Sequence, residues 1–237
     1  MALDHALAEL TPAGEGALRL YRWEPHTISF GRNEPTRGVY DVEEARREGL
    51  GLVRRPTGGR AVLHAREVTY CAVLPVGALG GLRRAYVRIN EGLVEGLRRL
   101  GCPAEVSQEG SALPPSAGPC FQAPAPGEVV LGGRKLVGSA QVRVGRNILQ
   151  HGSVILAGDQ SALGRLGGAG EGATPPATLE GTVGPRSWED VARALSEGVA
   201  LALGGGWRQG EVTPEENSRA RTLETERYAT DDWTWRR

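Results

Sequence analysis

The sequence predicts an α+β (α/β) fold in which a mixed, mostly antiparallel sheet is flanked by helices. Residues 51–75 and 128–156 each contain strand-like runs joined by short, glycine-containing connections. Residues 82–100 and 187–203 carry apolar side chains at the spacing of amphipathic helices, which pack on such a sheet. A chain of 237 residues can bury one large core but is short for two enzyme domains, so we expect a single domain over 1–237.

Short helices and strands alternate in the first third of the chain. Leu3, Leu7 and Leu10 recur at helical spacing, so a helix is expected over 2–10. Residues 41–49 indicate a second helix, which a glycine closes. Short apolar runs between turn residues predict the strands 18–23, 27–31, 51–55, 60–64 and 67–75.

The remainder contains the long helix at 82–100 and then a loop over 110–127. That loop is rich in Pro, Gly, Ala and Ser without periodicity, and loops this long inside a domain are often functional. A Gly-rich segment, 164–173, is expected to be mobile, and 213–233 should form one charged terminal helix. Three further strands extend the sheet: 128–133, 134–145 and 147–156.

Charge and hydropathy exclude several classes of partner. The formal net charge of +0 provides no basic surface for nucleic acid and no polybasic membrane patch. The start MALDHALAEL has no signal-peptide features, and no apolar run is long enough to span a bilayer, so we expect a cytoplasmic protein. Binding should therefore take place in a pocket.

One lysine, Lys135, stands among 27 arginines. The two residue types are interchangeable on a solvated surface, but not where a compact or deprotonatable amine is required. A leftover surface lysine is the simpler interpretation, and a functional amine is the other.

The three cysteines fit reduced thiols better than a disulfide framework, and their spacing is not that of a metal site. Cys71 alternates with Tyr70 and Ala72 in a strand and is expected in the core, while Cys102 follows a helix end and is expected to be inert packing. Cys120 lies in the Pro-rich loop. A loop thiol becomes a nucleophile when a nearby cation lowers its pKa, and the only lysine, Lys135, follows Cys120 by fifteen positions, beyond one turn.

Two glycine-containing motifs are candidates for ligand contacts. In RRPTGGRAVLH (54–64), the diglycine permits close backbone approach to a ligand, although a plain hairpin turn would use the same residues. In GGRKLVGSAQVR (132–143), Gly138-Ser139 interrupts a strand, which indicates either ligand approach or a β-bulge. His64 and His151 suit structural hydrogen bonding as well as function, and core packing is the better explanation for His151.

Three motifs, RRPTGGRAVLH, GRKLVGSAQ and ILQHGS, resemble in order and spacing the diglycine loop, lysine loop and His-Gly strand of one enzyme family. That family comprises the lipoyl and octanoyl attachment enzymes with the biotin/lipoate-protein ligase catalytic fold. The segment CFQAPAPGEVVLGGRKLVGSAQ is most similar to the Cys/Lys octanoyltransferases. GRNEP (31–35) resembles the ligase branch. The family usually has a strand before the first helix, whereas this sequence starts at that helix, so either the true start lies upstream or the strand is absent.

The resemblance implies octanoyl transfer from acyl carrier protein to a lysine of a lipoyl domain, such as the glycine-cleavage H protein. It implies that Cys120 carries the acyl group as a thioester, and that Lys135 stabilises the thiolate, positions the acyl carbonyl and relays protons. No cofactor or metal is expected. Val62 and Val137 are candidates for the acyl pocket, although core packing explains them equally well. The implied substrate-binding residues are Arg55, Thr57, Gly58, Gly59, His64, Gly138, Ser139, Ala140 and His151.

Two other functions stay open. An ATP-dependent lipoate-protein ligase shares the motifs and would require ATP and Mg, but it would not need Cys120. A non-catalytic binder of lipoyl domains would retain the fold without the chemistry.

Overall fold

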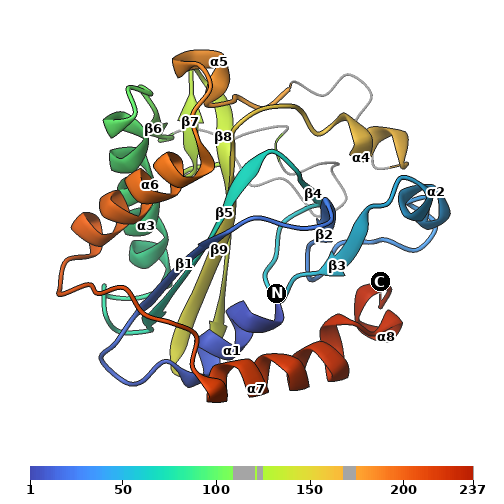
Figure 1. Ribbon diagram of the computed structural model, residues 1–237, viewed down its shortest axis with the longest axis horizontal. Helices are drawn as coiled ribbons and strands as arrows, with labels where there is room; N and C mark the ends of the chain where they lie inside the picture. Colours follow the sequence, from blue (N-terminus) through green and yellow to red (C-terminus); the bar gives the residue numbers. More distant parts are fainter. Residues whose placement is uncertain (109–120, 122–124, 168–174, 237) are drawn as a thin grey trace.

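The computed structural model of the protein describes residues 1–108, 121, 125–167 and 175–236, and the strands in this part of the chain form two sheets (Figure 1). The larger sheet has the order β1-β5-β9-β8-β7-β6, and each neighbouring pair is antiparallel. Its strands are β1 (Ala17–Tyr21), β5 (Glu67–Pro75), β6 (Glu105–Val106), β7 (Val129–Leu131), β8 (Arg134–Val144) and β9 (Asn147–Ile155).

The smaller sheet has β2 (Thr27–Phe30) at its centre. On one side β3 (Gly51–Arg54) runs parallel to β2, and on the other β4 (Val62–His64) runs antiparallel. Because β3 and β4 lie on opposite sides of β2, the residues between them do not form a hairpin turn, the alternative that the sequence left open. They cross the end of β2 instead.

This crossing brings two glycines together. Gly59 has a φ of +88°, which strongly favours glycine, and a Cβ on Gly31 would overlap the carbonyl oxygen of Gly59. The amide of Arg32 donates a hydrogen bond to the carbonyl of Thr57 at 2.8 Å. The diglycine loop is therefore fastened to the segment that follows β2.

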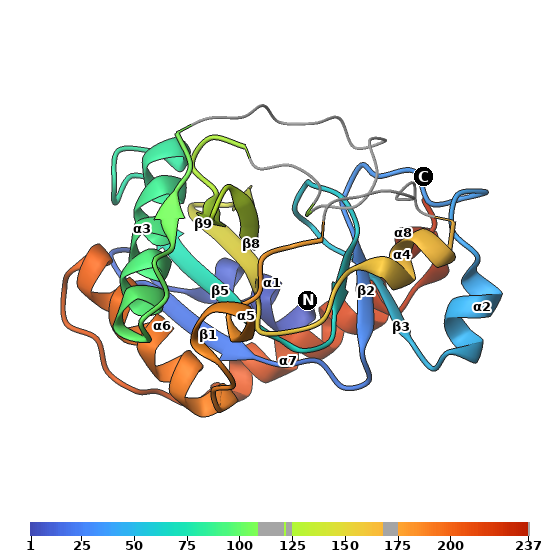
Figure 2. The ribbon, with the colours of Figure 1, turned by 90° about the horizontal axis from the view of Figure 1, so that it is seen from above.

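Two helices, α3 (Leu82–Arg99) and α6 (Trp188–Leu203), lie side by side on one face of the larger sheet, and the smaller sheet lies on the other side (Figure 2). The strand β5 shows how both faces are buried. Tyr70 belongs to the core beneath α3 and α6, while its neighbour Cys71 packs in the cluster with α1 (Ala2–Leu10). The opposite face of the larger sheet is thus available to form a pocket with the smaller sheet.

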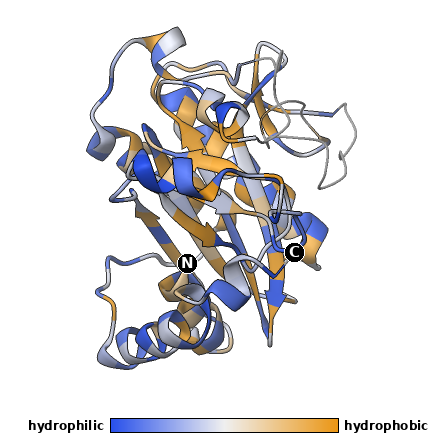
Figure 3. Ribbon diagram, turned by 90° about the vertical axis from the view of Figure 1, so that its right-hand side faces the viewer, coloured by the Kyte–Doolittle hydropathy of each residue, from blue (hydrophilic) through white to orange (hydrophobic). Residues whose placement is uncertain are grey.

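The remaining helices surround these layers. In Figure 1 the helix α7 runs beneath α1, and an ion pair between Arg219 and Glu9 joins the two. Figure 3 shows α7, at the bottom of the molecule, as mainly hydrophilic and the strands above it as largely hydrophobic. These helices are α2 (Val42–Arg47), α4 (Ser161–Arg165), α5 (Glu180–Val183), α7 (Pro214–Leu223), the π-helix η1 (Glu224–Tyr228) and α8 (Asp231–Thr234).

The predicted fold class is confirmed, but the prediction of a single terminal helix over 213–233 is wrong. The backbone passes from α7 into the π-helical turn η1, where the amide of Ala229 bonds to the carbonyl of Glu224. The helix α8 then begins afresh, because the side chain of Thr230 caps the amide of Trp233. Most of the predicted loop over 110–127 and of the Gly-rich segment 164–173 lies outside the described residues.

Glycines allow α3 and α6 to approach each other closely. A Cβ on Gly198 would overlap the carbonyl oxygen of Gly92 and the amide nitrogen of Gly96. We predict that Gly198→Ala lowers the free energy of unfolding by about 1–3 kcal/mol, the usual cost of overpacking. Urea denaturation measures this change. Gly210→Ala, at a position with open space around it, is the control and should have little effect. Equal stability of the two variants would contradict the tight contact.

Candidate active site

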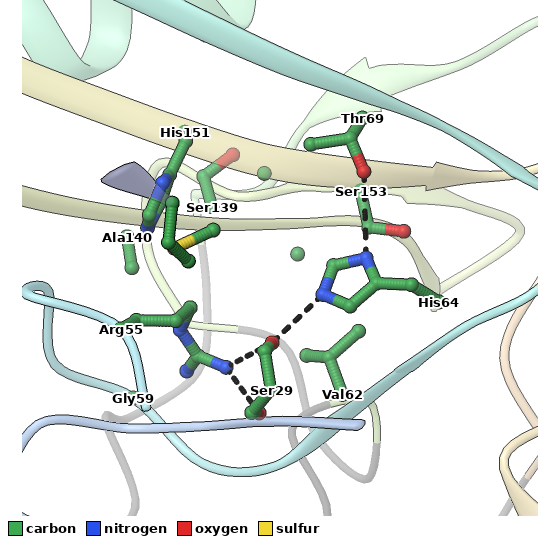
Figure 4. A pocket seen from close by; sticks show the side chains of 13 residues that line it. Ser29, Arg55, Gly59, Val62, His64, Thr69, Ser139, Ala140, His151 and Ser153 are labelled. Atoms are coloured by element: carbon green, nitrogen blue, oxygen red, sulfur yellow. Dashed lines mark hydrogen bonds between the residues drawn. The ribbon is translucent and has the colours of Figure 1, made fainter. Parts of the chain in front are cut away.

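A pocket lies between the two sheets (Figure 4). The smaller sheet and its diglycine loop contribute Ser29, Arg55, Gly59, Val62 and His64. The larger sheet contributes Thr69 from β5, Gly138, Ser139 and Ala140 from β8, and His151, Gly152 and Ser153 from β9. Met1 completes the lining. Motifs that are far apart in the sequence therefore meet at one site.

Seven of the predicted substrate-binding residues line this pocket: Arg55, Gly59, His64, Gly138, Ser139, Ala140 and His151. The register of β8 with β9 explains part of this grouping, because Ala140 lies opposite His151 and Gly138 lies opposite Ser153. Ser139 points its hydroxyl the other way, toward α3, where it bonds to Tyr70 of β5 and Asn90 of α3. Two other predicted residues, Thr57 and Gly58, bond to pocket residues.

Arg55 is a buried residue that shapes the pocket wall. Its Nη1 donates to the carbonyl and the hydroxyl of Ser29, at 2.6 and 2.8 Å. Its Nη2 donates to the carbonyls of Gly58 and Arg60, at 3.0 and 2.9 Å. The guanidinium of Arg55 therefore fixes the diglycine loop against β2. This role depends on arginine, because its several N–H donors lie in one plane.

His64 lies in a buried polar network. Its Nε2 is 2.7 Å from the Ser29 hydroxyl, and its Nδ1 is 3.7 Å from a carboxylate oxygen of Glu67. The Glu67 carboxylate accepts hydrogen bonds from the hydroxyls of Thr69 and Ser153. Every member of this network is at most 5 % exposed, so the hydroxyls supply the hydrogen bonds that a buried carboxylate needs. The ring of His64 is thereby oriented in the pocket.

His151 forms a second buried network at the pocket wall. Its Nε2 lies 2.6 Å from the Thr57 hydroxyl, and its Nδ1 lies 3.5 Å from the Asp4 carboxylate. Asp4 also accepts hydrogen bonds from Arg19 and Tyr21, both at 2.7 Å. Burial lowers the pKa of His151 despite this carboxylate, so the imidazole is neutral near pH 7. His151 is thus both a buried packing residue and part of the pocket lining.

Lys135 is 3 % exposed, so it is not a leftover surface lysine. Its Nζ donates to Oε1 of Glu128 at 2.7 Å and lies 5.5 Å from the centre of the Phe121 ring. Phe121 in turn packs in a buried cluster with the pocket residue Val62 and with Ile155. Lys135 is thus not one of the residues that line the pocket, and Phe121 links its ammonium to the pocket residue Val62.

The expectations for two cysteines are confirmed. Cys71 and Cys102 are buried, and burial raises the pKa of each thiol, which makes both poor nucleophiles. Cys120 lies outside the described residues. Its neighbour in sequence, Phe121, is the residue whose ring packs beside Lys135.

Sequence reasoning missed several residues of the site. Of the two valines considered for the acyl pocket, Val62 lines the pocket, whereas Val137 belongs to the core beneath α3. Glu128 was not recognised as the partner of Lys135, because a register shift between Val129 and Val130 makes the spacing across this hairpin unpredictable. The other lining or supporting residues that were not singled out are Met1, Asp4, Ser29, Glu67, Thr69, Gly152 and Ser153.

No helix in the described residues has the length and apolar character needed to cross a bilayer. No cluster of three or more His, Cys, Asp or Glu side chains in the same residues is arranged to hold a metal ion.

Comparison with known proteins identifies the family. Residues 1–183 match the lipoyl protein ligase A/B catalytic domain, and the chain belongs to this family. It is 42% identical to "Octanoyltransferase LipM" of Kyrpidia tusciae and 37% identical to that of Symbiobacterium thermophilum, over 100% of this chain and 94% and 93% of those proteins. A putative lipoate protein ligase from T. acidophilum with bound lipoic acid shares the fold, with a TM-score of 0.81 and 23% identity, over 100% of this chain and 92% of that one. The resemblance found in the sequence is confirmed.

Asp4 should make the stability of the site depend on pH. Burial opposes its charge, but the N-terminal ammonium, His151 and Arg19 outweigh burial and hold the pKa of Asp4 well below its usual range. Because the folded pKa is depressed, its stabilisation is complete above the unfolded value of about 3.9 and is lost as the pH falls toward the folded value. We predict that Asp4→Asn lowers the free energy of unfolding at pH 7 by about 3–5 kcal/mol.

Urea denaturation at pH 7 and pH 3 checks this prediction. The variant should also lose less stability than wild type between these two pH values. Asp232→Asn, at an exposed position, is the control and should behave like wild type. An unchanged pH dependence in Asp4→Asn would contradict the assigned role.

Proposed function

We propose that this chain transfers an octanoyl group from octanoyl-acyl carrier protein to a lysine of a lipoyl domain, through a thioester on Cys120 and with the help of Lys135. The full-length relatives named octanoyltransferases support this enzyme class. The observation that carries the proposal is the placement of the chain's single lysine. Its ammonium is buried and lies beside Phe121, the residue that follows Cys120 and that packs with the pocket residue Val62.

The first step is a transthioesterification. The Cys120 thiolate attacks the carbonyl carbon of the acyl thioester, a new S–C bond forms, and the bond between that carbon and the carrier sulfur breaks. The Lys135 ammonium gives a proton to the departing thiolate, so that the carrier leaves as a thiol. The positive charge beside the pocket also stabilises the thiolate before the attack.

The second step is aminolysis of the acyl-enzyme. The neutral ε-amine of the acceptor lysine attacks the same carbonyl carbon, the amide bond forms, and Cys120 leaves as a thiolate. Lys135, which is now neutral, takes up the proton that the attacking nitrogen releases. The ammonium and the thiolate are thereby restored, and no external acid, base or nucleotide is consumed.

The pocket suits a medium-length acyl group. Val62 contributes an apolar side chain to the lining, and Gly138 and Gly152 contribute no side chain that would fill the space. We assign the acyl chain to this space, and the backbone amides of Gly58, Gly59, Gly138 and Ser139 are candidates for contacts with the acyl carbonyl.

The whole chain acts as one catalytic domain in this proposal. The C-terminal helices support this view, because α6 packs on α3 and α7 is joined to α1. The acceptor would be a lipoyl-domain protein such as the glycine-cleavage H protein, and the reaction would take place in the cytoplasm, where thiols stay reduced.

Mass spectrometry of the intact protein tests the cysteine mechanism. After mixing with octanoyl-acyl carrier protein and no ATP, we expect one octanoyl adduct, which peptide mapping should place on Cys120. Cys120→Ser should abolish turnover, whereas Cys71→Ser and Cys102→Ser should retain it, because these buried thiols take no part. Transfer that occurs only with ATP and free octanoate or lipoate would show a ligase instead. Binding of a lipoyl domain without any adduct would show a non-catalytic binder.

Lys135→Arg should lose most of the activity. Arginine keeps the charge, but it is larger than the packed site of Lys135 allows, and it is effectively never deprotonated, so it cannot return a proton in the second step. Loss of a general acid–base group typically costs about a hundredfold or more in rate. Steady-state octanoyl transfer to a lipoyl domain measures the effect. Arg134→Lys, at the exposed neighbouring position, is the control, and near-normal turnover by Lys135→Arg would reduce Lys135 to a replaceable charge.

A further inference from the structure

Glu128 lies beside the proposed catalytic lysine and makes two different hydrogen bonds through its carboxylate. Oε1 accepts from Nζ of Lys135 at 2.7 Å, and Oε2 accepts from the amide of Ala125 at 2.9 Å. The amide of Glu128 donates back to the carbonyl of Ala125 at 3.1 Å, which closes a turn. Glu128 is 8 % exposed and Lys135 is 3 % exposed, so the pair is largely withdrawn from water.

The turn that carries Glu128 is held in place by a side chain of α3. Asn90, a fully buried residue of α3, donates from Nδ2 to the carbonyl of Gly127 at 2.6 Å. The Oδ1 of the same side chain accepts from Ser139 on β8 and from Gln150 on β9, at 3.1 and 3.2 Å. The turn is therefore held to the strands that form the pocket, and the carboxylate has a fixed position relative to Lys135.

A buried ammonium is costly unless a charged partner accompanies it. In this site the carboxylate of Glu128 supplies the charge, and its second oxygen is anchored by a backbone amide, so that it cannot rotate freely away from Nζ. Such an arrangement favours the protonated form of the lysine and restricts its direction.

We propose that Glu128 is a positioning residue that keeps Lys135 protonated in the resting enzyme and holds its Nζ beside Phe121, which packs with the pocket residue Val62. This inference rests on the proposed function, in which the reaction begins with a Lys135 ammonium and ends by restoring it. Glu128 itself exchanges no proton with substrate. It favours the return of the proton to Lys135 after the acceptor amine has attacked.

Glu128→Gln tests the proposal, because the carboxamide keeps the size and one hydrogen-bonding oxygen but removes the charge. We expect kcat to fall about tenfold or more at pH 9, where an unpaired buried lysine loses its proton, and to fall much less at pH 6. KM for octanoyl-acyl carrier protein should change little. Glu128→Asp keeps the charge and should retain the pH profile of wild type at a lower rate. Glu180→Gln, which removes an exposed ion pair with Arg66, is the control.

NMR of protein labelled with [15N]lysine separates this inference from the proposed function, since the label marks Lys135 alone. We expect the pH at which its Nζ resonance titrates to fall by about one unit or more in Glu128→Gln. An unchanged titration, or a rate loss that is equal at pH 6 and pH 9, would overturn the role of Glu128. A shifted titration with unchanged rates would overturn the catalytic role of Lys135, and with it the positioning role. If Glu128→Gln does not fold, both measurements are made on Glu128→Asp, which keeps the charge. A lowered titration pH of Nζ in this variant, together with a loss of kcat that is larger at pH 9 than at pH 6, would count against the charge as the cause.

Discussion

Hydrogen bonds from two adjacent arginines hold the wall of the pocket together. The segments after β2 and after β3 leave their strands, so their carbonyl groups have no partners in a sheet and need other donors. Arg54, which is fully buried, donates to the carbonyls of Gly31 and Glu34 after β2, and Arg55 donates to that of Gly58 after β3 and also to that of Ser29 within β2. Each guanidinium therefore supplies the N–H donors that a neighbouring strand would otherwise supply.

The hydrogen bonds of these two arginines also bear on which reaction the site can catalyse. Consecutive arginines next to a diglycine are an obvious place for a phosphate, as an ATP-dependent ligase would require. In this structure the guanidinium of Arg55 is directed to its own loop, and that of Arg54 also reaches the carbonyl of Thr234 in α8. The motif therefore builds the wall of the pocket, and the charge used in the proposed chemistry comes from Lys135 on the opposite sheet.

Much of this arrangement could be predicted from the sequence. Strand and helix periodicities located the main elements, and the motif order indicated that the segments containing Arg55, Ala140 and His151 would meet, as they do. The partners of these residues could not be predicted, because they depend on contacts between distant segments. Asp4 reaches His151 only through the packing of α1 on the larger sheet, and the π-helical turn before α8 leaves no signal in the hydrophobic pattern.

The near absence of lysine has a consequence for the fidelity of the reaction. An enzyme that carries an activated acyl thioester is exposed to attack by its own amines. Arginine is not such a nucleophile, because its guanidinium stays protonated at any physiological pH. With 27 arginines and one buried, ion-paired lysine, the chain offers no exposed ε-amine to a neighbouring acyl-enzyme. In the proposed reaction the exposed surface of the protein therefore offers no lysine amine for self-acylation.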